Sequence, residues 1–232
     1  MNLCLHCRRR LLTCVCSLLK PFETSSRFLL LMHPMEYKKE KVGTGRFSHL
    51  ILKNSEIIVD INFDENSHFQ RLLNDPFFET FLVYPGTHAV NLGDNKAVNF
   101  FNDKKKQFIL IDGTWPCAKK MMKLSTSLHS LPRVTFSSDR ISEFKVKHQP
   151  LPGCLSTVES IFQLIKDLNN LGIEHTDGLE DNLLEVFRHT VAQQITLASD
   201  PEKKGYRRKS YSASEDRKIS KKWSQRLLFF KS

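Results

Sequence analysis

The chain passes from an apolar run to a polar loop within one stretch, Phe108-Ile109-Leu110-Ile111-Asp112-Gly113-Thr114-Trp115-Pro116. Its first four residues form a short apolar run of the kind that is buried on both faces of a parallel sheet, and Asp112-Gly113 ends that run. Gly113 permits an unusual backbone angle, Thr114 can cap a helix, and Pro116 fits a first helical turn. The stretch therefore predicts a strand, a loop and the start of a helix.

Similar runs occur on both sides of this stretch, and apolar positions at helical spacing fill the intervals between them. The predicted strands are 27–32, 57–61, 80–84, 108–111 and 133–136, and the predicted helices are 117–128, 158–168 and 184–195. Alternating strands and helices indicate an α/β fold with a mainly parallel sheet flanked by helices. Ligands of such sheets gather beyond the carboxyl ends of the strands.

Polar residues concentrate at three of these predicted carboxyl ends. His33-Pro34-Met35-Glu36 closes the first strand, Tyr84-Pro85-Gly86 the third, and Asp112-Gly113-Thr114-Trp115 the fourth. One crevice could hold all three groups, because the carboxyl ends of parallel strands meet at the same edge of a sheet. The alternative interpretation is that Asp112 and Thr114 only cap the following helix.

The segment Gly153-Cys154-Leu155-Ser156-Thr157-Val158-Glu159 has a similar character. Ser156 or Thr157 could cap the helix that follows, and Glu159 in its first turn would favour the helix dipole. A loop of small residues that enters a helix can also hold a ligand by its backbone. The pattern fits both interpretations.

Four of the six cysteines lie within the first sixteen residues: Cys4, Cys7, Cys14 and Cys16. Thiolates suit a tetrahedral Zn²⁺, and a C-x2-C pair followed closely by a second pair can wrap one ion, although the second pair here is a tighter C-x-C. The alternative is two disulfides in a secreted protein, but no apolar signal segment precedes the cluster and Arg8, Arg9 and Arg10 interrupt it. We therefore expect a zinc knuckle in a cytoplasmic protein.

The net charge of +10 is concentrated near the end of the chain. Residues 203–232 hold eleven Lys and Arg against two acids, a net charge of 11 − 2 = +9. Such a segment indicates a polyanionic partner, because Lys and Arg neutralise phosphates in sequence-independent nucleic-acid binding. Tyr206, Tyr211 and Trp223 could stack on unpaired bases. The alternative is a solvated tail.

The longest apolar runs are too short to span a bilayer, so we expect no membrane segment.

The order of these motifs resembles that of the DTW-domain family, the tRNA-uridine aminocarboxypropyltransferases. The motifs are Cys4-x2-Cys7 with Cys14-x-Cys16, His33-Pro34-x-Glu36, Thr44-Gly45, Tyr84-Pro85-Gly86, Asp112-Gly113-Thr114-Trp115, Ser156-Thr157-x-Glu159, and Tyr206-Arg207-Arg208-Lys209-Ser210-Tyr211. The element Asp112-x-Thr114-Trp115 gives the family its name, and the resemblance covers nearly the whole chain. The family commonly has Ala where Ser160 stands here, which we expect to alter packing more than chemistry.

The resemblance implies a fold related to the knotted (SPOUT-like) RNA-modifying enzymes. We expect three regions: a zinc knuckle over residues 1–22, the α/β catalytic domain over 23–200, and a basic extension that contacts RNA over 201–232. The implied reaction moves the 3-amino-3-carboxypropyl group of S-adenosylmethionine to N3 of a uridine in tRNA. Its products are acp3U and methylthioadenosine. No obligate protein partner is evident.

The resemblance also implies roles for particular residues. Asp112 is the candidate catalytic residue, and we favour a base that takes the N3 proton over a hydrogen bond to the cofactor's amino group. Cofactor contacts are expected from Pro85, Gly86, Asp112, Thr114, Trp115, Leu155, Ser156, Thr157 and Glu159. RNA contacts are expected from Tyr206, Arg207, Arg208, Lys209 and Tyr211. The alternatives are an RNA methyltransferase with the same cofactor and a non-catalytic, zinc-containing RNA-binding protein.

Overall fold

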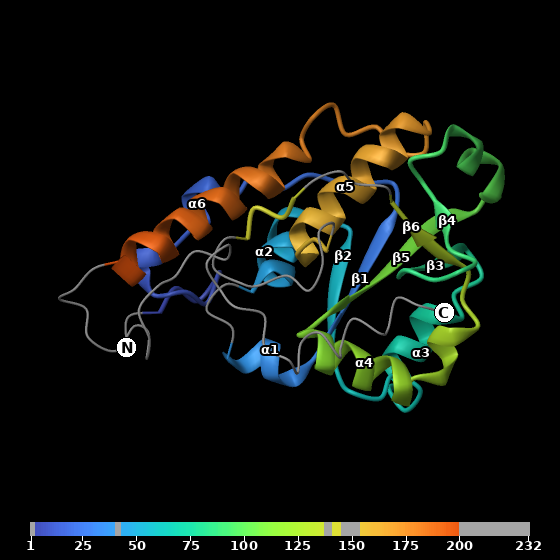
Figure 1. Cartoon of the computed structure of the whole chain (residues 1–232), viewed down its shortest axis with the longest axis horizontal. Helices are drawn as coiled ribbons and strands as arrows, with labels where there is room; N and C mark the ends of the chain where they lie inside the picture. The colour runs from blue at the N-terminus through green and yellow to red at the C-terminus, as the bar shows by residue number, and fades with distance from the viewer. Residues whose placement is uncertain (1–2, 40–42, 137–140, 145–153, 200–232) are drawn as a thin grey trace.

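A single parallel sheet forms the centre of the protein in a computed structural model that describes residues 3–39, 43–136, 141–144 and 154–199 (Figure 1). Within these residues the sheet has six strands in the order β2-β1-β5-β3-β6-β4. The strands are β1 (Arg27–Met32), β2 (Ser55–Val59), β3 (Phe78–Val83), β4 (Val90–Asn91), β5 (Lys105–Asp112) and β6 (Arg133–Thr135). All neighbours pair in parallel, which confirms the predicted α/β fold class.

Helices cover both faces of this sheet (Figure 1). They are α1 (Pro34–Lys39), α2 (Thr44–Ile51), α3 (Ser67–Leu73), α4 (Trp115–Leu124), α5 (Thr157–Asn170) and α6 (Asp181–Ser199). Short 3-10 helices lie at Leu11–Thr13, Cys16–Leu18, Asn95–Phe100 and Thr126–His129. Helices α2, α5 and α6 pack on one face, whereas α3 and α4 pack on the other.

The strand residues alternate between two hydrophobic cores because successive side chains of a strand point to opposite faces. Phe28 and Phe108 contact the core under α2, α5 and α6, which includes Phe187. Leu29 and Ile109 belong to the core with α3 and α4. Residues 28–31 of β1 are fully buried, as expected for a strand that is covered on both faces.

Two sequence predictions of local structure were incomplete. The predicted helix 117–128 ends at Leu124, because the buried Ser125 turns its hydroxyl to accept the N–H of Phe63 at 3.0 Å. A 3-10 helix then follows, and Asp64 accepts the N–H groups of Thr126 and Ser127. Helices α1, α2 and α3 and the two-residue β4 were not predicted, because all of them are too short for a clear period.

The N-terminal segment shares a core with the sheet. Cys7 and Val15 are buried in the same cluster as α2, α5 and α6. Arg9 donates hydrogen bonds to Thr190 and Gln193 of α6, both at 3.2 Å. The boundaries of the three predicted regions stay predictions, as does the relation to knotted enzymes, and the basic extension 201–232 lies outside the described residues.

Strands β1 and β5 lie side by side, but their connections leave in opposite directions. From β1 the chain passes through α1 and α2 to β2, the edge strand next to β1. From β5 it passes through α4 on the opposite face to β6, on the other side of the sheet. This is a topological switch point, and ligands of open α/β sheets bind outside the carboxyl ends of strands at such a point. Among the described helices, none combines the length and the apolar character that a membrane span requires.

Candidate active site and metal centre

The carboxylate of Asp112 lies at this switch point. Asp112 is the last residue of β5, pairs with Met32 at the end of β1, and is only 8% exposed. Its Oδ1 accepts a hydrogen bond from the Thr157 hydroxyl at 2.6 Å. On the other side, the backbone of Gly45 comes so close that a Cβ there would collide with Oδ2. Two helices that are far apart in sequence, α2 and α5, thus begin beside one carboxylate.

The first turns of two helices lie beside Asp112. The N-terminus of an α-helix carries a partial positive charge, and Gly45 and Thr157 lie in the first turns of α2 and α5. The hydrogen bond from Thr157 also goes to a carboxylate oxygen. An ionised Asp112 is what either of its expected roles needs, since a base must be ionised to accept a proton and a partner of an ammonium group must be negative.

The loop after β5 is held by the segment after β1. The His33 N–H donates to the main-chain oxygen of Asp112 at 3.0 Å, and the Glu36 carboxylate accepts the N–H of Thr114 at 3.2 Å. Gly113 fits closely, because a Cβ there would be 3.3 Å from the Cβ of Cys117. His33 is buried, and this burial together with the charge of Lys120 lowers its pKa, so it serves as neutral scaffolding.

Capping does not account for the loop at the start of α4. Thr114 occupies the N-cap position and is exposed, but its side chain makes no capping hydrogen bond. The N–H group of Thr114 is satisfied by Glu36 instead. Trp115 begins the helix and is half-buried. The side chain of Thr114 is therefore exposed in the loop that follows Asp112, where a ligand can reach it.

Helix capping does explain why Glu159 stands in the first turn of α5. This residue is 2% exposed, and its carboxylate accepts the N–H of Ser156 at 2.8 Å and the Ser156 hydroxyl at 2.6 Å. It also accepts the Ser142 hydroxyl at 2.8 Å and the N–H of Glu143 at 2.7 Å. Glu159 thus ties the segment 141–144 to the loop that enters α5, so that Thr157 is fixed toward Asp112. A cofactor contact of Glu159 itself stays a prediction.

The remaining predicted site residues lie near the same edge of the sheet. Pro85 and Asp112 each stand three residues beyond the paired residues Leu82 and Ile109 of β3 and β5. Pro85 and Gly86 are exposed, and a Cβ on Gly86 would lie 2.9 Å from Nη1 of Arg133. The half-buried Leu155 precedes Ser156. The RNA contacts predicted at Tyr206, Arg207, Arg208, Lys209 and Tyr211 lie outside the described residues.

The sequence placed Thr44-Gly45 in a motif but predicted no role for either residue. In the structure Gly45 has one: it lets the start of α2 approach Asp112. We expect Gly45→Ala to lower activity and to cost about 1–3 kcal/mol of stability by overpacking, because the new Cβ would also lie 3.1 Å from Met32 Cε. Alanine is the better helix former, so a loss cannot come from helix propensity.

Gly43→Ala is the matched control, since among the described residues a Cβ there would meet only Arg46 Cβ at 3.4 Å. Thermal unfolding and steady-state rates of the two variants provide the comparison. If the Gly45→Ala protein is as stable and active as the Gly43→Ala protein, the close approach to Asp112 is unimportant.

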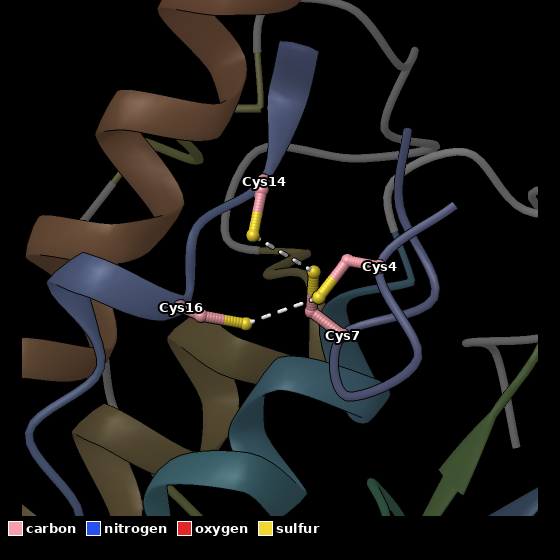
Figure 2. A group of neighbouring side chains, drawn as sticks. All are labelled: Cys4, Cys7, Cys14 and Cys16. Carbon is pink, nitrogen blue, oxygen red and sulfur yellow. Dashed lines mark hydrogen bonds between the residues drawn. The ribbon is translucent and has the colours of Figure 1, made fainter. Parts of the chain in front are cut away.

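The four N-terminal cysteines form a candidate metal centre (Figure 2). Their Sγ atoms all lie within 4.8 Å of one another, with 3.5 Å between Cys4 and Cys16 and 3.7 Å between Cys7 and Cys14. Four thiolates at about 2.3 Å from a tetrahedral Zn²⁺ would be about 3.8 Å apart, so the spacing suits this ion. The backbone N–H of Cys7, the Cys16 thiol and the backbone N–H of His6 lower the pKa of Cys4 to about 6, whereas burial and the neighbouring thiols raise the pKa of Cys16.

The fold and the site together define an α/β protein with a ligand site at the switch point of a parallel sheet and a cysteine cluster that could hold a metal ion. The sequence model of the DTW domain matches residues 1–195. The chain therefore belongs to the DTW-domain family, as its motifs predicted.

Curated relatives carry names that agree with this family. The chain is 33% identical to tRNA-uridine aminocarboxypropyltransferase 2 of Drosophila melanogaster over 73% of this chain and 67% of that protein. It is 29% identical to the Mus musculus protein of the same name, over 67% of this chain and 53% of the relative. It is 23% identical to tRNA-uridine aminocarboxypropyltransferase A of Arabidopsis thaliana, over 83% of this chain and 81% of that protein. The match thus spans about half the length of the mouse protein. No solved structure matches the chain.

Proposed function

We propose that this protein is a tRNA-modifying transferase that moves the 3-amino-3-carboxypropyl group of S-adenosylmethionine to N3 of a uridine, giving acp3U and methylthioadenosine. The observation that carries the proposal is the Asp112 carboxylate at the switch point, flanked by Thr157 and the backbone of Gly45. The names of the relatives support the reaction, and the position of the site supports a bound small molecule.

The charges at the site suit the amino-acid arm of S-adenosylmethionine. That arm carries an ammonium and a carboxylate, and the molecule has a positive sulfonium. Asp112 offers one buried carboxyl group, while the first turns of α2 and α5 offer backbone N–H groups and partial positive charge. We propose cofactor contacts from Asp112, Thr157 and the loop at Leu155 and Ser156, with Thr114, Trp115, Pro85, Gly86 and Glu159 around them.

S-adenosylmethionine, when bound, supplies a sulfonium whose aminocarboxypropyl carbon is open to attack. The protein's part is to hold the two reactants in line, which can contribute about 7–11 kcal/mol to the barrier reduction. As the N3–carbon bond forms and the carbon–sulfur bond breaks, the N3 proton must leave. We propose that Asp112 accepts it, for a gain on the order of 10² to 10⁴. The rival role is a hydrogen bond from the cofactor's ammonium group to the same carboxylate.

We further propose that the basic extension binds tRNA through Tyr206, Arg207, Arg208, Lys209 and Tyr211. The support comes from its composition, with eleven Lys and Arg among residues 203–232 and interleaved aromatic residues. The candidate metal centre is proposed to hold Zn²⁺ through Cys4, Cys7, Cys14 and Cys16.

Analysis of the small-molecule product separates this function from the methyltransferase alternative. Purified protein incubated with S-adenosylmethionine and unmodified tRNA should release methylthioadenosine. Release of adenosylhomocysteine would mean methyl transfer and would overturn the proposal. If S-adenosylmethionine does not bind at all, the non-catalytic RNA-binding alternative is favoured. A reaction without tRNA gives the background rate of cofactor breakdown.

A further inference from the structure

Two arginines, one from the cysteine knuckle and one from α2, contact the same tyrosine of α1 beside the candidate active site. Nη1 of Arg8, in the cysteine knuckle, donates to the Tyr37 hydroxyl at 3.0 Å. Nη2 of Arg46, in α2, donates to the main-chain oxygen of Tyr37 at 3.1 Å. The two guanidinium carbons lie 5.6 Å and 4.6 Å from the centre of the Tyr37 ring. These three residues are called the Arg-Tyr-Arg cluster below.

Within the described part of the chain, no carboxylate is paired with the two arginines of this cluster. Among the described residues, neither Arg8 nor Arg46 forms an ion pair with a carboxylate. Arg8 is exposed, and so are Arg10 and Lys38, which add further positive charge to the knuckle and to α1. The cluster is therefore a positive surface with an aromatic ring at its centre.

The cluster is attached directly to the residues around Asp112. Arg46 follows Gly45, whose backbone contacts the Asp112 carboxylate. The N–H of Tyr37 donates to the main-chain oxygen of His33 at 3.2 Å, and the His33 N–H in turn donates to the main-chain oxygen of Asp112. An RNA whose base reaches Asp112 would place the phosphates next to that base near Arg46, Tyr37 and Arg8.

We infer that the Arg-Tyr-Arg cluster binds the RNA backbone next to the target nucleotide. Guanidinium groups bind phosphates in a bidentate manner, and an aromatic ring flanked by arginines can also stack on an unpaired base. The inference rests on the proposed function, because it takes RNA to be the substrate. It assigns RNA contacts to the folded body of the protein, in addition to those proposed for the basic extension.

The backbone conformation at Arg8 allows its guanidinium to be removed without backbone strain. Arg8 has a positive φ of 55°, a conformation that glycine adopts without strain. Arg8→Gly thus removes the guanidinium while keeping or improving the stability of the knuckle. Arg46→Ala removes the second guanidinium within a helix. Arg71→Ala, on the exposed surface of α3, is the control for the loss of one positive charge elsewhere.

Equilibrium binding of unmodified tRNA to the full chain should be measured at several salt concentrations. We expect Arg8→Gly and Arg46→Ala each to weaken binding severalfold and to reduce the salt-dependence slope by roughly one, while Arg71→Ala has little effect. The thermal midpoint should not fall in Arg8→Gly, and the affinity for S-adenosylmethionine should be unchanged in both variants.

Affinities and salt slopes of Arg8→Gly and Arg46→Ala equal to those of Arg71→Ala would overturn the inference. A wild-type chain that does not bind tRNA would overturn it as well. The proposed function is judged separately by the product assay. If the wild-type chain forms no aminocarboxypropyl-uridine, the proposed function fails. The inference still stands in that case if the two variants bind tRNA more weakly than the wild-type chain.

Discussion

Replacement of Asp112 by asparagine is expected to lower turnover by about 10² to 10⁴ while tRNA binding persists. The amide has the same size and can still accept the Thr157 hydrogen bond, now 2.6 Å long, so the fold around α5 should be kept. The change removes only the negative charge that lies between the first turns of α2 and α5. Single-turnover rates with tRNA and saturating S-adenosylmethionine would measure the loss.

The same variant separates the two roles proposed for Asp112. If the carboxylate is the base, Asp112→Asn should bind S-adenosylmethionine with nearly normal affinity and fail in turnover. If it holds the cofactor's ammonium group, cofactor binding should be lost first. Asp94→Asn is a suitable control, because Asp94 caps the 3-10 helix Asn95–Phe100 and asparagine caps equally well. Turnover retained in Asp112→Asn would remove this residue from the mechanism.

Loss of the metal is expected to have the largest effect on stability. Structural zinc sites contribute directly to folding, and here the buried Cys7 belongs both to the cysteine cluster and to the core under α6. We expect the wild-type protein to contain one zinc ion per chain. Cys7→Ser should lose this ion, and a cost on the order of 3 kcal/mol would lower the thermal midpoint by roughly 10 °C.

Elemental analysis and thermal unfolding of the same preparations would check this expectation. Cys117→Ser is the control, because Cys117 lies in α4 outside the cysteine cluster and its replacement should leave the metal in place. A wild-type protein that folds cooperatively without any metal, or a Cys7→Ser variant as stable as Cys117→Ser, would contradict the structural role of the cluster.

The features that the sequence predicted well are those with a local signature. β1 was predicted because a strand covered on both faces must be apolar throughout, and residues 28–31 are indeed fully buried. The cysteine cluster was predicted because metal ligands are recognisable by residue type and spacing, and the four Sγ atoms do come together. The place of Asp112 followed from the strand that it ends.

The features that the sequence did not predict depend on contacts between distant segments. The Thr157 hydroxyl meets Asp112 across 45 residues, and no local pattern distinguishes it from a helix cap. Gly45 is required by the close approach of α2 to a carboxylate that belongs to another strand. The Arg-Tyr-Arg cluster joins the knuckle, α1 and α2, and α1 and α2 are too short for a reliable helical period.

The proposed reaction is tested most directly by following the two transferable groups of S-adenosylmethionine in parallel reactions with unmodified tRNA. One preparation carries the isotope label in the methyl group, and the other carries it in the aminocarboxypropyl chain. Mass spectrometry of the digested tRNA should find the chain label on uridine and no methyl label. Methyl label in the tRNA, with none from the chain, would contradict the proposed reaction.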